Sequence, residues 1–292
     1  MKRDRLWKFQ YRAAPYLFIA PFLVLFAVFL VYPLCTSCLL SFHRTEGAGH
    51  HTFIGLGNYR YLLLHDRIFG LAVLNTAAFT VMFLLLQVPI SLGLAVLLNS
   101  KQVRWRSFFR FTFFSSYLVG QVFVAVVFFQ LFSSDGLINK ILGVDVPWLT
   151  KPSLILPSVL IADLWLTAGY GMIYFLAALQ SVDQDLYEAA HIDGAGAWQS
   201  FIHITLPGIR PVLIFVILVG TIGGFQLFEL PYVLLQGPGP GYRGLTIVMY
   251  LFIAGFNNGD LGYAAAIGWI LVGILLLATL AQLRLFGASR EV

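Results

Sequence analysis

The chain has 292 residues, of which 59% are hydrophobic and only 11% are charged. Soluble proteins carry about 45–50% apolar and about 25% charged residues, and disordered chains are still less apolar. The composition therefore excludes a soluble domain and a disordered chain, and it predicts an all-α integral membrane protein. The net charge of +5 is interpreted as a signal of membrane topology rather than of nucleic-acid binding.

Long apolar segments lie between the few charged residues. A membrane-spanning helix needs about 20 apolar residues. On this criterion we predict one transmembrane domain over residues 1–292 with six spans, at about 16–40, 71–98, 111–132, 153–179, 211–235 and 262–286. The apolar stretch Leu245–Phe256 is too short to cross a bilayer and is expected to form a re-entrant or surface helix.

The basic residues are distributed unevenly between the two sides of these spans. With the N-terminus inside, the cytoplasmic segments hold twelve of the 18 basic residues: Lys2, Arg3, Arg5, Lys8, Arg12, Lys101, Arg104, Arg106, Arg110, Arg210, Arg284 and Arg290. Loops rich in Lys and Arg stay in the cytoplasm. Both termini are therefore predicted to be cytoplasmic, which agrees with an even number of spans.

The cytoplasmic loop 180–210 differs from the others because it is rich in acids rather than bases. Asp183 is a good N-cap for a first short helix that ends at Gly194. A second short helix is expected over about 197–204, ending before Pro207. Both helices carry apolar residues that nothing in water would cover, so the loop is expected to dock against a partner.

A sequence signature lies within this loop. Glu188-Ala189-Ala190, three residues, Gly194, nine residues, and then Ile204-x-Leu206-Pro207 resemble the EAA signature of ABC-importer permeases at full length and spacing. Further segments resemble the carbohydrate branch of that family, the binding-protein-dependent sugar permeases: Asp193-Gly194-Ala195, Ala20-Pro21-Phe22, Tyr32-Pro33, Phe53 to Tyr59, and Asn75-Thr76. The chain is most similar to the maltose F-type and glycerol-phosphate A-type subunits, although it lacks the large outer domain of the maltose F subunit.

The resemblance implies a type I ABC-importer permease fold and a place in a bacterial or archaeal cytoplasmic (inner) membrane. It also implies partners: a second homologous permease, a dimer of ATPase subunits, and an extracytoplasmic solute-binding protein. ATP and Mg²⁺ would be bound by the ATPase, because this chain has no GxxxxGK[ST] motif and no cofactor is expected in it. The residues that would form the ATPase-coupling element are Glu188, Ala189, Ala190, Asp193, Gly194, Ile204, Leu206 and Pro207.

Polar residues inside the predicted spans are candidates for contact with the substrate. Asp163, Thr167, Tyr170 and Tyr174 share one helical face, and a carboxylate beside aromatic rings suits a sugar. Tyr117 and Gln121 would share a face of the third span, and Gln226 and Glu229 a face of the fifth; Asn75 and Gln87 are further candidates in the second. Each could instead bond a neighbouring helix, and Glu229 could lie at the outer headgroup level.

No metal site or catalytic site is predicted. The first outer loop contains His43, His50, His51 and His65, but their spacing matches no standard metal site. Two other functions stay open. A self-sufficient secondary transporter would usually show internal repeats, and none is convincing here; a membrane-embedded enzyme would need paired catalytic residues, which are lacking.

Overall fold

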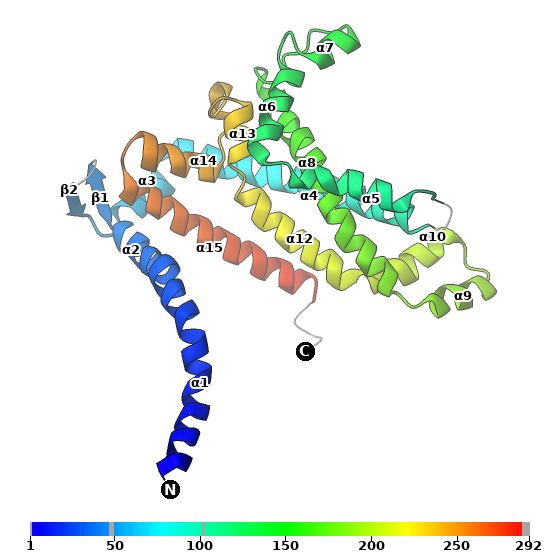
Figure 1. Cartoon of the computed structure of the whole chain (residues 1–292). Helices are drawn as coiled ribbons and strands as arrows, with labels where there is room; N and C mark the ends of the chain where they lie inside the picture. The colour runs from blue at the N-terminus through cyan, green and yellow to red at the C-terminus, as the bar shows by residue number, and fades with distance from the viewer. Residues whose placement is uncertain (1, 47–49, 101–102, 288–292) are drawn as a thin grey trace. The chain divides into compact units, whose positions relative to one another are not determined.

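The computed structural model describes residues 2–46, 50–100 and 103–287, with side chains from residue 14 onward except at 46 and 50 (Figure 1). The described residues form two compact units. One lies within Met1–His65 and Leu251–Ile270, and the other within Asp66–Tyr250 and Leu271–Val292. Several residues used in the sequence analysis lie outside the described part: Lys101, Arg290, and the side chains of Lys2, Arg3, Arg5, Lys8, Arg12 and His50.

The first unit begins with a long apolar helix and a short hairpin. Its elements are α1 (Lys2–Phe26), η1 (Ala27–Val31), α2 (Tyr32–Leu40), β1 (His43–Glu46), β2 (His50–Phe53), α3 (Gly57–Leu64) and η5 (Ile253–Asn257). It also holds the start of α15 (Leu261–Leu285). Asp260 fastens the hairpin to that start, since its Oδ1 accepts from Thr45 Oγ1 and from the Tyr263 amide, both at 3.0 Å.

The second unit is built around two long helices. α4 (Arg67–Asn99) and α8 (Pro152–Ser181) pack along one another (Figure 1). Around them lie α5 (Arg106–Ser115), η2 (Ser116–Leu118), α6 (Gln121–Phe132), α7 (Leu137–Leu142), α9 (Gln184–Ile192), α10 (Ala197–Ser200), η3 (Phe201–Thr205), α11 (Leu206–Gly208), α12 (Arg210–Phe225), α13 (Glu229–Leu234), η4 (Pro240–Tyr242) and α14 (Ile247–Phe252).

Two apolar clusters form the core of the second unit. One joins α4, α6, α8 and α13 around Phe79, Phe128 and Leu230. The other joins α4, α8 and α12 around Phe175 and Val216. Both clusters include one flank of α8, so this helix is fixed along most of its length.

Five helices in the described part are long and apolar enough to cross a membrane: Ala14–Leu40, Arg67–Asn99, Gln121–Leu142, Pro152–Ser181 and Leu261–Leu285. The pair Ala197–Gly208 and Arg210–Phe225, bent by 68°, makes a sixth if it counts as one span. The chain is thus a helical protein with several apolar helices of membrane-crossing length. The short apolar helix expected at Leu245–Phe256 is present as Ile247–Asn257.

Two of the expected spans are not continuous helices. The segment 111–132 is divided because Val119 and Gly120 are extended between η2 and α6. The segment 211–235 is divided at Gln226–Phe228, between α12 and α13. Pro231 explains part of the second break: within an uninterrupted helix its ring would remove a hydrogen bond, whereas in the first turn of α13 no such bond is needed.

Candidate functional site

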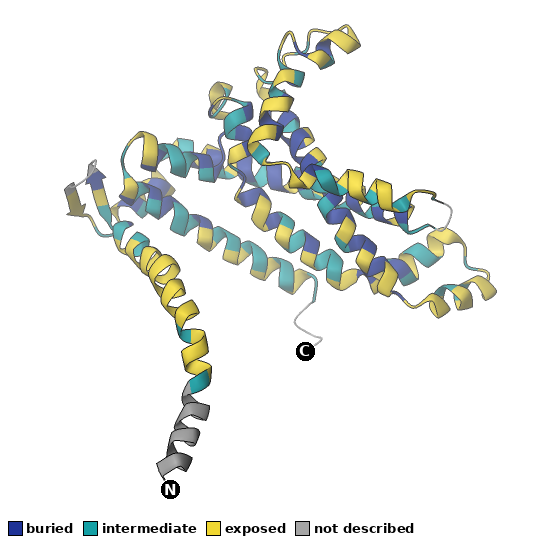
Figure 2. Ribbon diagram, viewed as in Figure 1, coloured by how far each residue is buried: buried dark blue, intermediate teal, exposed yellow. Residues whose placement is uncertain are grey.

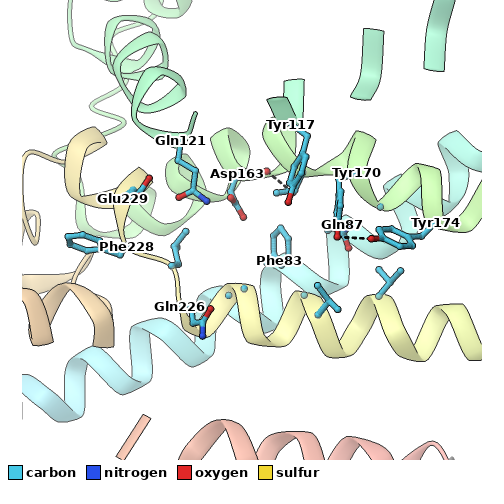
Figure 3. A pocket seen from close by; sticks show the side chains of 18 of the residues that line it. Phe83, Gln87, Tyr117, Gln121, Asp163, Tyr170, Tyr174, Gln226, Phe228 and Glu229 are labelled. Atoms are coloured by element: carbon cyan, nitrogen blue, oxygen red, sulfur yellow. Dashed lines mark hydrogen bonds between the residues drawn. The ribbon is translucent and has the colours of Figure 1, made fainter. Parts of the chain in front are cut away.

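A cavity of about 530 Å³ lies inside the second unit (Figure 3). Its wall is made by α4, α8 and α12, by the two interrupted segments described above, and by α14. This volume lies within the roughly 300–1,000 Å³ typical of pockets for small molecules. The cavity is therefore large enough for one or two sugar rings.

The polar face predicted on α8 opens into this cavity. Asp163, Thr167, Tyr170 and Tyr174 all line it. Their shared face follows from helical spacing on an uninterrupted helix, so sequence was sufficient to group them. Their contact with a substrate stays a prediction.

Asp163 is buried without a partner. Its side chain extends into the cavity and is only 6% exposed (Figure 3). Within the described part of the chain its carboxylate makes no hydrogen bond or ion pair; Thr167 Oγ1 donates to the backbone carbonyl of Asp163 instead, at 2.7 Å. A buried polar group without a partner is costly, which marks this position as a candidate binding residue.

Gln87 presents a second buried oxygen without a donor. Its Nε2 donates to Ser91 Oγ at 3.2 Å, and Ser91 Oγ donates to the Ala168 carbonyl at 2.9 Å. Gln87 Oε1 has no hydrogen-bond partner among the described residues. Because Ser91 uses its proton on Ala168, the amide orientation of Gln87 is fixed, with Oε1 as the free acceptor.

Aromatic rings form a row along the cavity. The rings of Tyr117 and Tyr170 stack with centroids 4.3 Å apart. Tyr170 meets Tyr174 edge to face at 4.9 Å, and their hydroxyl oxygens are 2.8 Å apart. Tyr174 in turn packs against Phe215, with centroids 5.3 Å apart. Such faces suit the C–H surfaces of a sugar ring.

The interrupted segments bring four more of the expected residues to the cavity. Tyr117 lies in η2 and Gln121 begins α6, while Gln226 lies in the second break and Glu229 begins α13. The expectation that each pair shares a face of one continuous helix is wrong, because a break separates its members. The breaks themselves place these side chains at the cavity wall.

Asn75 bonds a neighbouring segment, which is the alternative that the sequence left open for it. It does not line the cavity; its Nδ2 donates to the carbonyls of Tyr242 and Leu245, at 2.7 and 3.1 Å. Asn75 therefore ties α4 to the segment before α14. Conversely, Phe83, Phe215 and Phe228 line the cavity and were not identified from the sequence, because phenylalanines in so apolar a chain carry no distinguishing signal.

The loop 180–210 forms two helical arms joined by a turn. As expected, Asp183 caps the first arm, α9, with its Oδ1 accepting from the Asp185 amide at 3.0 Å. Gly194 ends it with φ +78°, a conformation that favours glycine. The second arm runs from Ala197 to Gly208, so the expectation that it ends before Pro207 is wrong.

A π-helical turn explains how the second arm passes a proline. In η3 the Leu206 amide donates to the Phe201 carbonyl, five residues back. Pro207 has no N–H and cannot continue the i to i−4 hydrogen bonds of an α-helix. The wider π-helical turn just before it lets the helix continue without that bond. The arm then meets α12 at a bend of 68°.

Most of the coupling candidates lie on the outside of this loop. Glu188, Ala189, Asp193, Gly194 and Pro207 are exposed (Figure 2). Ala190, Ile204 and Leu206 are half-buried. The two arms are held together by a 2.9 Å hydrogen bond between the hydroxyls of Tyr187 and Thr205.

Between the arms lies a shallow groove of about 330 Å³. Ala190, Asp193, Gly194 and Ile204 contribute to its wall. Large apolar side chains stand free beside it: Ile192 is 85% exposed and Trp198 is 71% exposed. An exposed apolar surface of this kind is typical of an interaction site.

The histidines do not assemble a metal site in the described structure. His43 lies against Phe53 with its Nδ1 2.8 Å from the Leu39 carbonyl. Among the residues described, no three His, Cys, Asp or Glu side chains come together as a metal site would require.

Comparison with known proteins identifies relatives over nearly the whole chain. The family "Binding-protein-dependent transport system inner membrane component" matches residues 87–288. The arabinooligosaccharides transport system permease protein AraP of Bacillus subtilis (strain 168) is 38% identical over 285 residues, 96% of this chain and 90% of AraP. The lactose transport system permease protein LacF of Rhizobium radiobacter is 35% identical over 97% of this chain and 96% of LacF.

A solved structure shows the same architecture. The crystal structure of a bacterial ABC transporter involved in the import of the acidic polysaccharide alginate contains a chain with 25% sequence identity. The two superpose with a TM-score of 0.84 over 97% of this chain and 99% of the other.

Proposed function

The chain belongs to the family of binding-protein-dependent transport system inner membrane components and is a permease subunit of a sugar ABC importer; from this premise we propose that its cavity lies on the sugar's path and that its loop 180–210 couples to the ATPase. The family match and the similarity to the alginate importer also show that the chain has the type I permease fold. The alternative of a self-sufficient secondary transporter is set aside.

The observation that carries the proposed path is the carboxylate of Asp163, which lies in the cavity wall with no hydrogen-bond partner among the described residues. Sugar hydroxyls would donate to this carboxylate, the Gln87 amide lies behind it in the wall, and the outer face of the stacked Tyr117–Tyr170 pair would pack on the sugar ring. Thr167, Tyr174, Gln121, Gln226 and Glu229 complete the proposed polar contacts. A site of this kind binds a sugar weakly enough for release, because most contacts are single hydrogen bonds worth about 1 kcal/mol each.

The proposed coupling element is the outer surface of the loop 180–210. Small residues at Ala189 and Ala190 permit close approach, and the exposed Glu188 carboxylate could pair with a basic residue of an ATPase. Asp193, Gly194, Ile204, Leu206 and Pro207 complete this element.

The loop 180–210 is connected to the cavity wall through one helix, α12. The second arm of the loop continues through a buried Ile209 into α12, and α12 ends at Gln226 in the cavity wall. Gly208 lies so close to Val182, at the end of α8, that a Cβ on it would stand 2.9 Å from Val182 Cγ2. We propose that movement of the loop reaches the cavity through α12, and that the contact of Gly208 with Val182 passes it to the end of α8 as well.

The remaining parts of the machine would be supplied by other chains. We propose a second, homologous permease that completes the path, a dimer of ATPase subunits that binds ATP and Mg²⁺, and an extracytoplasmic solute-binding protein, with both termini of this chain in the cytoplasm. The family's dependence on a binding protein supports the last of these partners.

Affinity purification from membranes that contain all four components tests this proposal. The tagged chain should retain the ATPase, and Glu188→Ala should lose much of the ATPase and most sugar uptake while inserting normally. Asp185→Ala is the matched control, because Asp185 is also exposed on α9 but lies outside the signature. A wild-type chain that captures no ATPase, or a Glu188→Ala chain that behaves like the control, would contradict the coupling role.

A further inference from the structure

The charged residues that line the cavity are all acidic in the described part of the chain. Two carboxylates, Asp163 and Glu229, contribute to its wall. Among the described residues that line it there is no Lys, Arg or His. Its other polar groups are the amides of Gln87, Gln121 and Gln226 and the hydroxyls of one threonine and three tyrosines. A ligand that carries negative charge would find no cation in this wall.

The two deepest polar groups both lack a donor. Asp163 is 6% exposed and Gln87 is 4% exposed, and neither the Asp163 carboxylate nor Gln87 Oε1 receives a hydrogen bond from the described residues. The amide orientation of Gln87 is fixed by the Ser91 hydroxyl, which donates to Ala168. A ligand in the cavity can therefore donate to the Asp163 carboxylate without displacing a donor of the described residues.

Sugar hydroxyls and ammonium groups can donate to these oxygens, whereas an ionised carboxylate or sulfonate cannot. An anionic group placed here would bring no donor to the Asp163 carboxylate and would lie near a second carboxylate, Glu229, with no cation in the described wall to offset the repulsion. The fold does not impose this charge, since the similar alginate importer is described as carrying an acidic polysaccharide. The charge preference must come from the residues of the wall.

We propose that the cavity accepts an uncharged, hydroxyl-rich sugar and rejects uronic acids and other anionic sugars, and that Asp163 is the specificity-determining residue. The inference rests on the proposed function in one respect: it takes the cavity to be the sugar's path. It adds the class of sugar that can use that path.

Binding to the purified complex of permeases and ATPase tests the inference directly. The solute-binding protein is left out, so that its own selectivity does not enter. The probes are methyl glucoside with methyl glucuronide, and methyl galactoside with methyl galacturonide; each pair differs only by a CH₂OH or a carboxylate at C6. Saturation-transfer NMR at neutral pH suits the weak affinities expected.

For at least one pair, the neutral glycoside should bind roughly tenfold or more tightly than its uronide, because like charges brought together in a binding site cost several kcal/mol. A glycoside with an ammonium group, methyl glucosaminide, should bind at least as well as methyl glucoside. Uronides that equal or exceed their neutral partners would overturn the proposal, and so would the absence of binding by every neutral probe.

The variant Asp163→Asn tests whether Asp163 causes the preference for neutral sugars over uronides. The variant keeps an acceptor oxygen and the size of the side chain but removes the charge, so the ratio between neutral sugar and uronide should fall several-fold. Asp135→Asn is the control, because Asp135 is an exposed carboxylate outside the cavity. An unchanged ratio in a correctly assembled Asp163→Asn complex would contradict the role of Asp163. If that variant does not assemble, the glucosaminide comparison on the wild-type complex decides.

A separate uptake measurement distinguishes this inference from the proposed function. If cells with the complete importer take up no sugar through it, the proposed function fails. If they take up neutral sugars while the purified complex binds uronides equally well, only the charge preference fails.

Discussion

Two walls of the same cavity are built differently. α8 crosses the second unit as one helix of 30 residues and presents four polar side chains from one face. The opposite segment, α12 with α13, stops at Phe225 and restarts at Glu229. The sequences of both segments are strongly apolar. The length of an apolar segment therefore indicates where a chain crosses the membrane, but not whether it crosses as one continuous helix.

The difference lies in what supports each wall. Gly169 and Gly171 allow α8 to lie very close to its neighbours: a Cβ on Gly169 would collide with the backbone carbonyl of Phe113, and one on Gly171 with the side chain of Gln87. In α12, a Cβ on Gly220 or Gly224 would meet only side chains, nearest those of Leu84 and Thr80, and a Cβ on Gly223 would meet nothing within 4 Å. We infer that α8 is the fixed wall and that the interrupted segment is where the cavity changes shape.

The variant with the largest expected effect is Gly169→Ala, which tests whether α8 is the fixed wall. The added methyl would collide with backbone of α5 rather than with a flexible side chain, so the helices must separate. We expect a loss of more than about 3 kcal/mol of stability, measured as a fall in Tm and in the yield of assembled complex. Gly70→Ala in α4, where nothing lies within 4 Å, is the control. Equal yields and Tm values would show that α8 is not rigidly held.

The second largest effect is expected from the carboxylates, whose removal should change uptake affinity differently on the two walls. Asp163→Ala removes a buried acceptor from the fixed wall, and a hydrogen bond to a charged group is worth about 1.5–3 kcal/mol, or roughly ten- to a hundredfold in apparent affinity for sugar uptake. Glu229→Ala removes an exposed carboxylate, for which we expect less than about a threefold change. Unchanged uptake affinity in Asp163→Ala would remove Asp163 from the path.

Sequence predicted the fixed wall better than the interrupted one. Helical spacing on α8 was enough to group Asp163 with Tyr174, because a regular helix converts spacing into direction. The same reasoning failed for Gln226 and Glu229, since a break of three residues resets direction and no local rule placed it. Pro231 was visible in the sequence, but proline is tolerated inside membrane helices when neighbours satisfy the freed groups.

The loop shows the same division between local and tertiary causes. The Asp183 cap and the Gly194 turn are local, and both were predicted. The passage of the second arm through Pro207 depends on a π-helical turn, which has no sequence rule here. The sequence could not decide between the two roles open to Asn75, because its partners, the carbonyls of Tyr242 and Leu245, are about 170 residues away and become neighbours only in the fold.

Two adjacent glycines of α12, Gly223 and Gly224, differ in how closely they contact α4. A Cβ on Gly224 would stand 2.6 Å from Thr80 Oγ1 and 3.1 Å from Thr80 Cβ, and that hydroxyl already donates to the Thr76 carbonyl at 2.8 Å. Gly224→Ala should therefore cost about 1–3 kcal/mol by thermal unfolding of the complex. Gly223→Ala should be neutral or stabilising, by up to about 1 kcal/mol. A reversed order would place the tight contact on the other side of α12.

The smallest expected effect comes from the hydroxyl pair on the fixed wall. Tyr174→Phe removes the 2.8 Å contact with the Tyr170 hydroxyl but keeps both rings and their packing. We expect a loss of about 1 kcal/mol, seen as a small fall in Tm with less than about a threefold change in uptake affinity. Tyr170→Phe should cost the same amount, and the double variant should cost no more than either single change, because both break one shared bond. Additive losses would mean that each hydroxyl has a partner of its own, and a loss of uptake affinity well above threefold would show that the Tyr174 hydroxyl is a main contact to the sugar rather than a minor one.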